Sequence, residues 1–275
     1  MEYPPLRPPL DEAALRDQLC GPAGLWSRLD VIEETGSTNA DLVARCASGE
    51  DIDGVVLLAE NQTAGRGRHG RQWSGPPRSQ LALSVGISAG GVPTSGWGWL
   101  TLATGVALAE AIAEFCGLQI GLKWPNDVIV DDGTSVRKLA GILAEVAAPT
   151  QLIVVGLGLN VTLTAEEVPD PAATSLAMLG AQLLDRNILA EKVLRHLAHR
   201  IAAWRDAGGA DEALVRDYRR LSATLGVRVR AEIPGDRSVQ GIARAVDDLG
   251  RLVIDTDHGT VTVSAGDIFR LRPSG

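Results

Sequence analysis

Lysine, cysteine and long apolar runs are the scarce features of this 275-residue sequence. The three cysteines are scattered and form neither a C-x-x-C pair nor a Cys/His metal spacing, which indicates a reduced, cytoplasmic protein. The N-terminus has no basic start followed by an apolar run, so we expect no signal peptide. No stretch of about 18 uninterrupted apolar residues occurs, so we also expect no membrane span.

Positive charge is in deficit and is carried almost entirely by arginine. The formal net charge is -8, from 26 basic and 34 acidic residues, and the pI is about 5.1. This balance argues against broad binding of nucleic acid by overall charge, although a local basic patch is compatible with it. The only lysines are Lys123, Lys138 and Lys192. Each lysine is therefore a mild indication of a specific use, while codon bias explains the arginine excess equally well.

Helix and strand patterns over the first three quarters of the chain predict an α+β fold, in which a mixed β-sheet is covered by helices. Helices are expected at 38–48, with Ser37 or Thr38 as N-cap, at 100–117, ending at Gly117, and at 185–206. The last has an apolar stripe, which indicates a core-facing helix. Strands are expected at 54–60, 81–88, 118–124, 127–130, 138–146 and 151–161. Residues 1–10 contain four prolines and are expected to be poorly ordered.

The periodicity changes near Leu225. From there, short segments alternate apolar and polar residues between turns at Pro-Gly-Asp, Asp-Leu-Gly and Asp-His-Gly. This pattern predicts a small antiparallel β-barrel of about 50 residues. A glycine-containing hinge (207–212) and a short helix through Tyr218 precede it. We therefore expect a domain at 1–216 and a second domain at 217–275.

A polar segment rich in glycine, arginine and proline separates the first two strand patterns. Its centre, GRGRHGRQW (65–73), matches the dinucleotide-binding pattern G-x-G-x-x-G. That fingerprint needs a strand directly before it and a helix directly after it. Here the strand pattern ends near Glu60, and Gly75, Pro76 and Pro77 exclude a helix. The next acidic residue is Glu110, so the ribose-binding carboxylate is missing as well. We therefore reject the dinucleotide interpretation.

The same segment suits an anionic ligand. Its glycines allow backbone amides to approach a ligand closely, and Arg66, Arg68 and Arg71 offer permanently charged, planar donors for phosphate or carboxylate. A loop of this kind orders over a ligand and excludes water. The alternative is a disordered RGG-like segment that binds nucleic acid nonspecifically. The sequence of the segment favours phosphate chemistry over that alternative.

Three further motifs place polar residues at strand ends. LKWPNDVIV (122–130) offers Lys123 and Asn126, with Trp124 more typical of a core residue. RKLAGILAE (137–145) contains Lys138, whose simplest interpretation is a solvated charge at a strand start. GLGLN (156–160) ends a buried strand, and its glycines indicate close backbone approach before Asn160.

Taken together, these motifs resemble those of the biotin protein ligases. The matching pieces are TGSTNADL (35–42), AENQTAGRGRHGRQW (59–73), LKWPNDVIV, RKLAGILAE, GLGLN, LDRNILA (184–190) and the C-terminal barrel. They occur in the family's order from about residue 30 to the end of the chain. The resemblance implies a mixed-sheet catalytic domain followed by a small SH3-like β-barrel domain, in agreement with the change of periodicity.

The resemblance also implies a reaction. Enzymes of this family activate biotin with Mg²⁺ and ATP to biotinyl-5'-AMP and then transfer the biotinyl group to a lysine of a biotin carboxyl carrier domain. The first step brings a carboxylate toward a polyanion, so positive groups and backbone amides must offset the repulsion. We expect biotin and ATP as substrates, no tightly bound prosthetic group, carrier domains of biotin-dependent carboxylases as partners, and neither nucleic acid nor a membrane.

By family match, the roles fall on named residues of this sequence. Lys138, Arg66 and Arg68 are the expected catalytic residues. Biotin is expected to contact Ser37, Thr38, Asn39, Gln62, Gly65, Arg66, Arg68, Lys138 and Gly141. ATP and the adenylate are expected to contact Arg66, Arg68, Arg71, Trp73, Lys123, Asn126, Lys138 and Asn160. The metal ligands are left open.

Two alternatives stand beside this assignment. A lipoate or octanoate ligase shares the catalytic fold, and the polar cluster at Ser37, Thr38 and Asn39 favours a ureido-bearing ligand over lipoate. Bifunctional family members carry an N-terminal winged helix-turn-helix, and only about 30 residues precede TGSTN here. The sequence therefore predicts a monofunctional ligase rather than a repressor.

Overall fold

A seven-stranded sheet forms the framework of the first domain. The computed structural model describes residues 7–21, 26–148, 150–168, 170–233, 237–264 and 266–271. In it the strands follow the order β1-β2-β3-β7-β6-β5-β4. Their bounds are β1 (Arg28–Thr35), β2 (Val55–Gln62), β3 (Gln80–Ser88), β4 (Gly121–Lys123), β5 (Asp127–Asp131), β6 (Val136–Ala147) and β7 (Leu152–Asn160). β1 and β2 are parallel and the other pairs antiparallel, so the predicted mixed sheet is confirmed.

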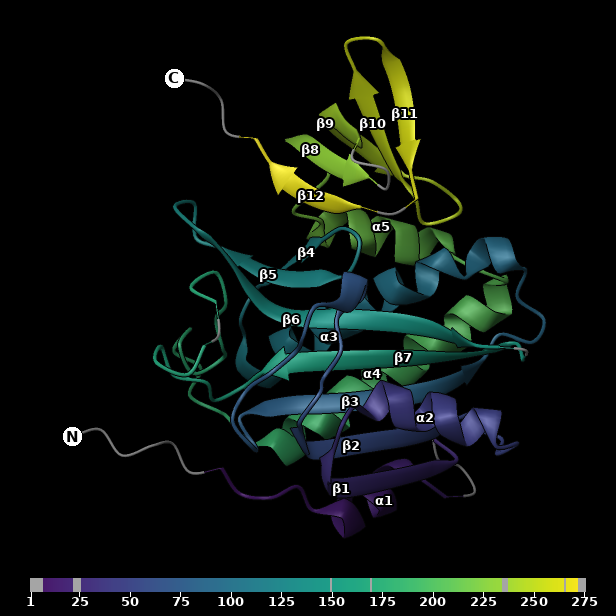
Figure 1. Cartoon of the computed structure of the whole chain (residues 1–275), viewed down its shortest axis with the longest axis vertical. Helices are drawn as coiled ribbons and strands as arrows, with labels where there is room; N and C mark the ends of the chain where they lie inside the picture. Colours follow the sequence, from purple (N-terminus) through teal and green to yellow (C-terminus); the bar gives the residue numbers. More distant parts are fainter. Residues whose placement is uncertain are drawn as a thin grey trace.

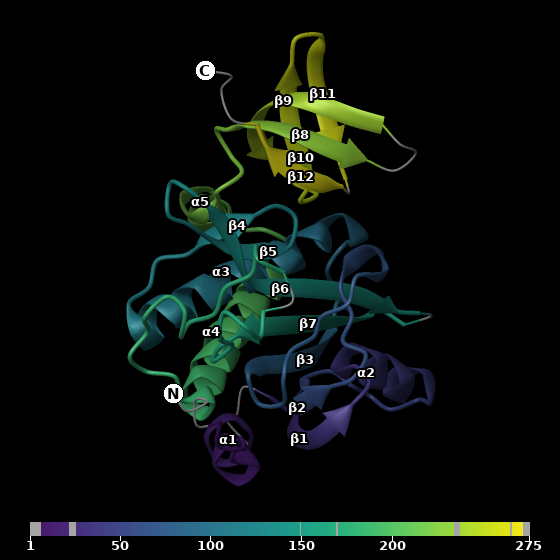
Figure 2. The ribbon, with the colours of Figure 1, turned by 60° about the vertical axis from the view of Figure 1, so that its left-hand side comes forward.

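Helices cover both faces of this sheet (Figure 1). The helices are α1 (Glu12–Leu19), α2 (Thr38–Ala47), α3 (Gly98–Cys116), α4 (Arg186–Ala207) and α5 (Glu212–Leu221). Figure 2 shows α3 and α4 packed together on one face and α2 on the other. The segment 63–79, which connects β2 to β3, runs along the same face as α2. That face therefore carries two of the motifs predicted to bind the ligand.

The predicted helix boundaries follow local chemistry. Ser37 caps α2 by accepting a hydrogen bond from the Ala40 amide. Gly117 ends α3 in the left-handed region at φ 73°, where a Cβ would be strained. The apolar stripe of α4 is buried, as predicted (Leu189, Val193, Leu197, Ile201 and Trp204).

Helix α3 is part of the one helix among the described residues that is long and apolar enough to be a candidate membrane span. Together with the 3₁₀ turn before it, it is long and apolar enough to cross a membrane by composition. Most of it is buried, however, between the sheet and α4. It is therefore a core helix.

The C-terminal domain is a five-stranded antiparallel sheet in the order β11-β10-β9-β8-β12. Its strands are β8 (Arg228–Ile233), β9 (Arg237–Val246), β10 (Leu252–Thr256), β11 (Gly259–Val263) and β12 (Asp267–Arg270). Indole groups of the first domain hold it in place: Trp99 donates to the Asp247 carbonyl at 3.0 Å and Trp124 to the Gly250 carbonyl at 3.0 Å. The proposed boundary at 216/217 falls inside α5, and the division of the chain at that point stays a prediction.

α1 and β1 were not predicted from the sequence, and residues 7–10 differ from the expected poor order. Residues 1–6 lie outside the described residues, but the four that follow are fixed to the body of the domain. Arg7 pairs with Glu167, and Leu10 is buried and donates its amide to Glu60. The prolines therefore do not prevent residues 7–10 from being ordered.

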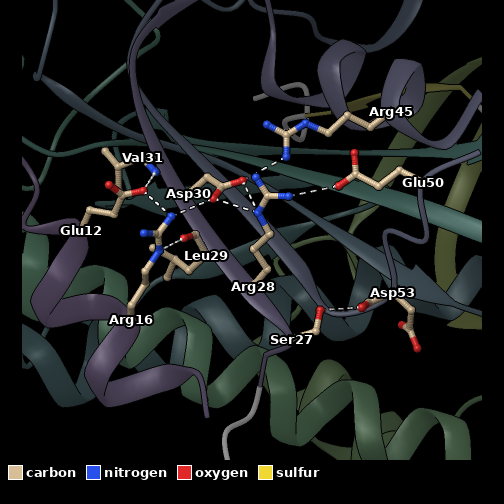
Figure 3. Close-up of polar contacts among 10 residues, drawn as sticks. All are labelled: Glu12, Arg16, Ser27, Arg28, Leu29, Asp30, Val31, Arg45, Glu50 and Asp53. Atoms are coloured by element: carbon tan, nitrogen blue, oxygen red, sulfur yellow. Dashed lines mark hydrogen bonds and ion pairs between the residues drawn. The ribbon is translucent and has the colours of Figure 1, made fainter. Parts of the chain in front are cut away.

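A cluster of charges attaches the edge strand β1 to the helices beside it (Figure 3). Asp30 is 7 % exposed and accepts hydrogen bonds from Arg16, Arg28 and Arg45 at 2.9–3.0 Å. Burial raises the pKa of the Asp30 carboxyl, but the hydrogen bonds from Arg28, Arg45 and Arg16 outweigh it, so the net pKa is lowered. One carboxylate thus ties α1, β1 and α2 together.

Candidate active site

A cavity of about 450 Å³ lies against the sheet face that carries α2 and the segment 63–79. β6 and β7 form its floor, and β12 of the C-terminal domain reaches one side through Asp267, Ile268 and Phe269. Nearly every residue predicted for the site lines it: Ser37, Thr38, Asn39, Gln62, Arg66, Arg68, Arg71, Trp73, Lys123, Asn126, Lys138, Gly141 and Asn160. The motifs are therefore brought together in one place, although they lie up to about 120 residues apart in the chain.

Gly65 is the exception among the predicted residues. It is buried and does not line the cavity, and a Cβ there would lie 2.3 Å from the Trp73 carbonyl oxygen. The Trp73 amide donates to the Gly65 carbonyl at 2.8 Å. Gly65 thus lets the two ends of GRGRHGRQW meet, and its predicted contact with biotin stays a prediction.

Hydroxyl and amide side chains line one end of the cavity. The Gln62 side-chain oxygen accepts from the Thr38 amide at 2.9 Å and contacts the Thr38 hydroxyl at 3.1 Å. The Thr38 hydroxyl lies 2.7 Å from that of Ser84, which donates to Asn39 Oδ1 at 2.6 Å. Thr38, Asn39 and Ser84 are all buried. The N-terminal turn of α2 therefore presents a preorganised set of hydrogen-bonding groups.

Cationic groups gather at the other end. Lys138 Nζ lies 2.6 Å from Asp127 Oδ1 and 5.6 Å from the centre of the Trp73 ring. A Cβ on Gly141 would stand 3.2 Å from this Nζ, so a glycine is what leaves room for the lysine. Lys123 lines the same region and has no ion-pair partner among the residues that the structure describes. Lys138 is thus a cavity residue rather than a solvated rim charge.

Trp73 lies over the glycines of the floor. A Cβ on Gly158 would overlap its indole at 2.3 Å from Nε1, and one on Gly141 would touch the ring at 3.4 Å. Its Nε1 is buried and has no hydrogen-bond partner in the described part of the chain. The prediction that adenine stacks on this ring stays untested.

Asn160 already has partners for its amide. It accepts from Gln80 at 2.9 Å and donates to the Thr174 carbonyl at 2.9 Å. Its side chain is 3 % exposed. These contacts hold the end of β7 against 172–176, and the nucleotide contact predicted for Asn160 remains a prediction.

The three arginines of GRGRHGRQW reach three different parts of the fold. Arg66 pairs with Glu145 of β6 at 2.8 Å, and Arg68 donates to Asn126 at 3.2 Å. Arg71 pairs with Asp267 of the C-terminal domain. The segment therefore lies across the cavity and is tied to both domains.

Of these three arginines, Arg68 is the one most withdrawn from water. Burial is the main cause that lowers the pKa of its guanidinium, and the neighbouring Arg71 charge lowers it further, while the Asp267 and Asp127 carboxylates oppose this. A buried guanidinium near several charges gains from an anionic ligand that satisfies its donors. The contact with phosphate predicted for Arg68 stays a prediction.

The geometry of the segment also confirms the rejection of the dinucleotide interpretation. Within GRGRHG the chain forms a three-residue 3₁₀ turn, Arg68–Gly70, and not the start of a helix. His69 and Gly70 both have positive φ, at 56° and 73°. The Gly67 amide donates to the Arg71 carbonyl at 2.7 Å, which closes the turn.

Sequence reasoning missed four polar residues of the site. Ser84 sits within the buried strand β3, outside every quoted motif, and Glu145 is the last residue of RKLAGILAE, where no role was assigned to it. Asp267 comes from the C-terminal domain, which no local pattern connects to the cavity. Asp127 follows Asn126 in LKWPNDVIV, was given no role in the site, and pairs with Lys138. Asp127 and Glu145 thus lie inside quoted motifs, whereas Ser84 and Asp267 do not.

Comparisons with known proteins agree with the cavity. Residues 31–160 match the Biotin/lipoate A/B protein ligase family, and residues 224–271 match the Biotin protein ligase C terminal domain. The chain is 56% identical to the biotin–[acetyl-CoA-carboxylase] ligase of Mycobacterium tuberculosis, over 97% of this chain and 98% of that protein. It is 33% identical to the bifunctional ligase/repressor BirA of Escherichia coli, over 88% of this chain and 73% of that one.

A solved structure shows the same fold. The biotin protein ligase from Aquifex aeolicus, in complex with biotin and ATP, superposes with a TM-score of 0.75 and 25% identity, over 90% of this chain and 100% of that one. The fold, the two matching domains and the near full-length similarity lead to one assignment: the chain belongs to the biotin protein ligases, as an enzyme of the biotin–[acetyl-CoA-carboxylase] ligase type.

Proposed function

We propose that the cavity activates biotin with ATP to biotinyl-5'-AMP and transfers the biotinyl group to a lysine of a biotin carboxyl carrier domain. The observation that carries this proposal is the division of one cavity into an end lined by hydroxyl and amide side chains and a cationic end. Thr38, Asn39 and Gln62 form the first end, and Lys138 and Arg68 belong to the second. Biotin has the same two parts, a ureido ring and a carboxylate.

The reaction requires the two ends to act together. In the first step a biotin carboxylate oxygen attacks the α-phosphorus of ATP, and the bond to pyrophosphate breaks. Two anions must approach each other, so the Lys138 ammonium and the Arg68 guanidinium stabilise the charge that develops between them. Lys138 holds its charge on the cavity floor beside Asp127, where it requires little rearrangement during the reaction.

The second step needs no covalent enzyme intermediate. The amine of the acceptor lysine attacks the acyl carbon of the adenylate, the bond to AMP breaks, and the amine loses a proton. Between the steps the segment that contains Arg66 and Arg68 shields the adenylate from water. We propose that Trp73, Lys123, Asn126 and Asn160 surround the nucleotide part.

Magnesium ion fits the donors of this site. Among the described residues there is no group of three His, Cys, Asp or Glu side chains that could hold a metal by itself. Mg²⁺ in nucleotide sites needs only one or two carboxylates, with substrate phosphates and water as the other ligands. Asp127 and Asp267 line the cavity, and Mg²⁺ would replace the Lys138 or Arg71 cation with which each of them pairs. When bound, Mg²⁺ would neutralise phosphate charge.

The neighbouring function in this fold is ligation of lipoate or octanoate, since the matching family includes both kinds of ligase. The hydrogen-bonding end formed by Thr38, Asn39 and Ser84 favours biotin, because lipoate and octanoate have no polar ring to satisfy these groups. We further propose that the reaction takes place in the cytoplasm, without a nucleic acid partner.

A labelling experiment tests the proposal. The purified chain is incubated with a biotin carboxyl carrier domain, Mg²⁺ and ATP, and with biotin, lipoate or octanoate in parallel. We expect the mass of the carrier to increase by one biotinyl group only with biotin and ATP, and omission of Mg²⁺ to prevent it. Labelling with lipoate or octanoate in place of biotin would contradict the proposal.

A further inference from the structure

Glu145 contacts both the segment over the cavity and the polar end of its floor. One carboxylate oxygen, Oε1, lies 2.8 Å from Arg66 Nη2. The other, Oε2, accepts a hydrogen bond from Asn39 Nδ2 at 2.9 Å. Arg66 and Asn39 come from two motifs that are unconnected in the sequence. A single carboxylate therefore joins them.

The contact with Asn39 determines which end of that amide faces which neighbour. Asn39 Nδ2 donates to Glu145 and to the Leu143 carbonyl, at 2.9 and 3.1 Å, and both of these are acceptors only. Asn39 Oδ1 is thereby turned toward the Ser84 hydroxyl at 2.6 Å. Because Asn39 is 3 % exposed, its amide has no water with which to exchange these partners freely.

The contact with Arg66 is of a different kind. The Arg66 side chain is 50% exposed and that of Glu145 23% exposed. Ion pairs as exposed as this contribute little to stability, so the pair can open when ligands enter and leave. Glu145 therefore has one firm contact in the floor and one weak contact with the segment above it.

We propose that Glu145 is a positioning residue that couples closure of the segment 65–73 to the orientation of Asn39 in the biotin-binding end of the cavity. This inference rests on the proposed biotin-binding roles of Arg66 and Asn39. When the segment closes, Arg66 holds the Glu145 carboxylate in the position that orders Asn39. Once ligand has engaged Asn39, the ordered carboxylate holds Arg66 in return, as reciprocal coupling requires.

The substitution Glu145→Gln tests the coupling with little change of shape. A glutamine amide has only one acceptor, and its NH₂ group would face the donors of either Arg66 or Asn39. We expect the KM for biotin to rise about tenfold and biotinyl-AMP to dissociate about tenfold faster, while kcat at saturating biotin changes less than about twofold. A purely structural role would instead lower the melting temperature and the active fraction, with KM unchanged.

A matched control and a rescue accompany this variant. Glu114 pairs with Lys192 at 2.5 Å on the helical face, so Glu114→Gln removes an equivalent charge away from the cavity and is expected to leave KM unchanged. Glu145→Asp keeps two acceptors and is expected to recover part of the loss in KM. A KM for biotin in Glu145→Gln equal to that of the wild type would overturn the inference.

A double-mutant cycle with Arg66→Gln tests the coupling itself. We expect the loss caused by Arg66→Gln to be several-fold smaller when Glu145 is already glutamine, because the two residues act through one contact. Losses that simply multiply would contradict the coupling. Failure of the wild-type chain to label a carrier with biotin would instead count against the proposed function, so the two failures are distinguishable.

Discussion

The indole of Trp73 lies directly on the backbone of Gly158, where a Cβ would stand 2.3 Å from Nε1. Asn39 stands in the same relation to Gly156, whose Cβ would lie 2.1 Å from Asn39 Oδ1. Residues two apart on a strand face the same side. The two glycines of β7 therefore form the floor at two ends of one cavity, under two different recognition groups.

Alanine substitutions at Gly156 and Gly158 are expected to raise the KM of one substrate each, biotin or ATP. Gly158→Ala displaces Trp73 and should raise the KM for ATP about tenfold, with a smaller effect on biotin. Gly156→Ala displaces Asn39 and should raise the KM for biotin about tenfold, with a smaller effect on ATP. Steady-state pyrophosphate exchange with each substrate varied in turn measures both.

Gly36→Ala is the control for this pair. Its Cβ would have nothing within 4 Å, and its φ is not in the left-handed region. We expect kinetics like those of the wild type. If Gly156→Ala and Gly158→Ala impaired both substrates equally, the assignment of one end of the cavity to each substrate would be wrong.

Arg68 is expected to retain the adenylate. Arg68→Gln removes a partly buried charged donor group, so biotinyl-AMP should dissociate at least about tenfold faster. The measurement is the rate at which preformed biotinyl-AMP leaves the enzyme. Arg78→Gln is the matched control, because Arg78 lies in the same connecting segment but pairs with Glu33 outside the cavity. Equal rates of biotinyl-AMP release from Arg68→Gln and from the wild type would show that Arg68 does not retain the adenylate.

The Asp30 cluster predicts a pH-dependent part of the stability. The folded pKa of Asp30 is lowered, so its stabilising contribution is complete above the unfolded pKa of about 4 and is lost as pH falls through the folded value. Asp30→Asn should reduce the free energy of unfolding by about 2 kcal/mol at pH 7. The difference from the wild type should shrink as the pH falls below about 4.

Urea unfolding of both proteins between pH 2 and 7 measures this difference. Asp257→Asn serves as the control, because Asp257 is exposed and has no ion pair with any described residue. If Asp30→Asn were less stable than the wild type by the same free energy of unfolding over the whole pH range, the charge of Asp30 would contribute nothing to stability.

Much of the fold was predictable because its signals are local. Ser37 caps a helix, Gly117 ends one, and the stripe on α4 faces the core, each for reasons contained in a few neighbouring residues. The first strand and helix lacked such signals. β1 contains RLDVIEET, whose acidic residues hide the strand pattern, and its Asp30 is stable only because arginines from α1 and α2 converge on it.

The site was predictable where residues lie in motifs and was missed where contacts are long-range. The family resemblance predicted site roles for Lys138, Arg68 and Asn39, which lie in separate motifs. The fold brings all three to one cavity. Glu145 and Asp267 escaped because their partners, Arg66 and Arg71, lie 79 and 196 residues away along the chain. No local pattern encodes a contact between a β-strand and a loop so distant.

The most direct test of the account compares Lys138→Ala with Lys192→Ala in biotin-dependent exchange of pyrophosphate into ATP. Lys192 pairs with Glu114 on the helical face and is the one lysine outside the cavity. We expect Lys138→Ala to lose at least about a hundredfold in exchange rate while keeping the melting temperature of the wild type, and Lys192→Ala to remain fully active. Exchange at the wild-type rate in Lys138→Ala would contradict the central claim that this cavity carries out adenylation.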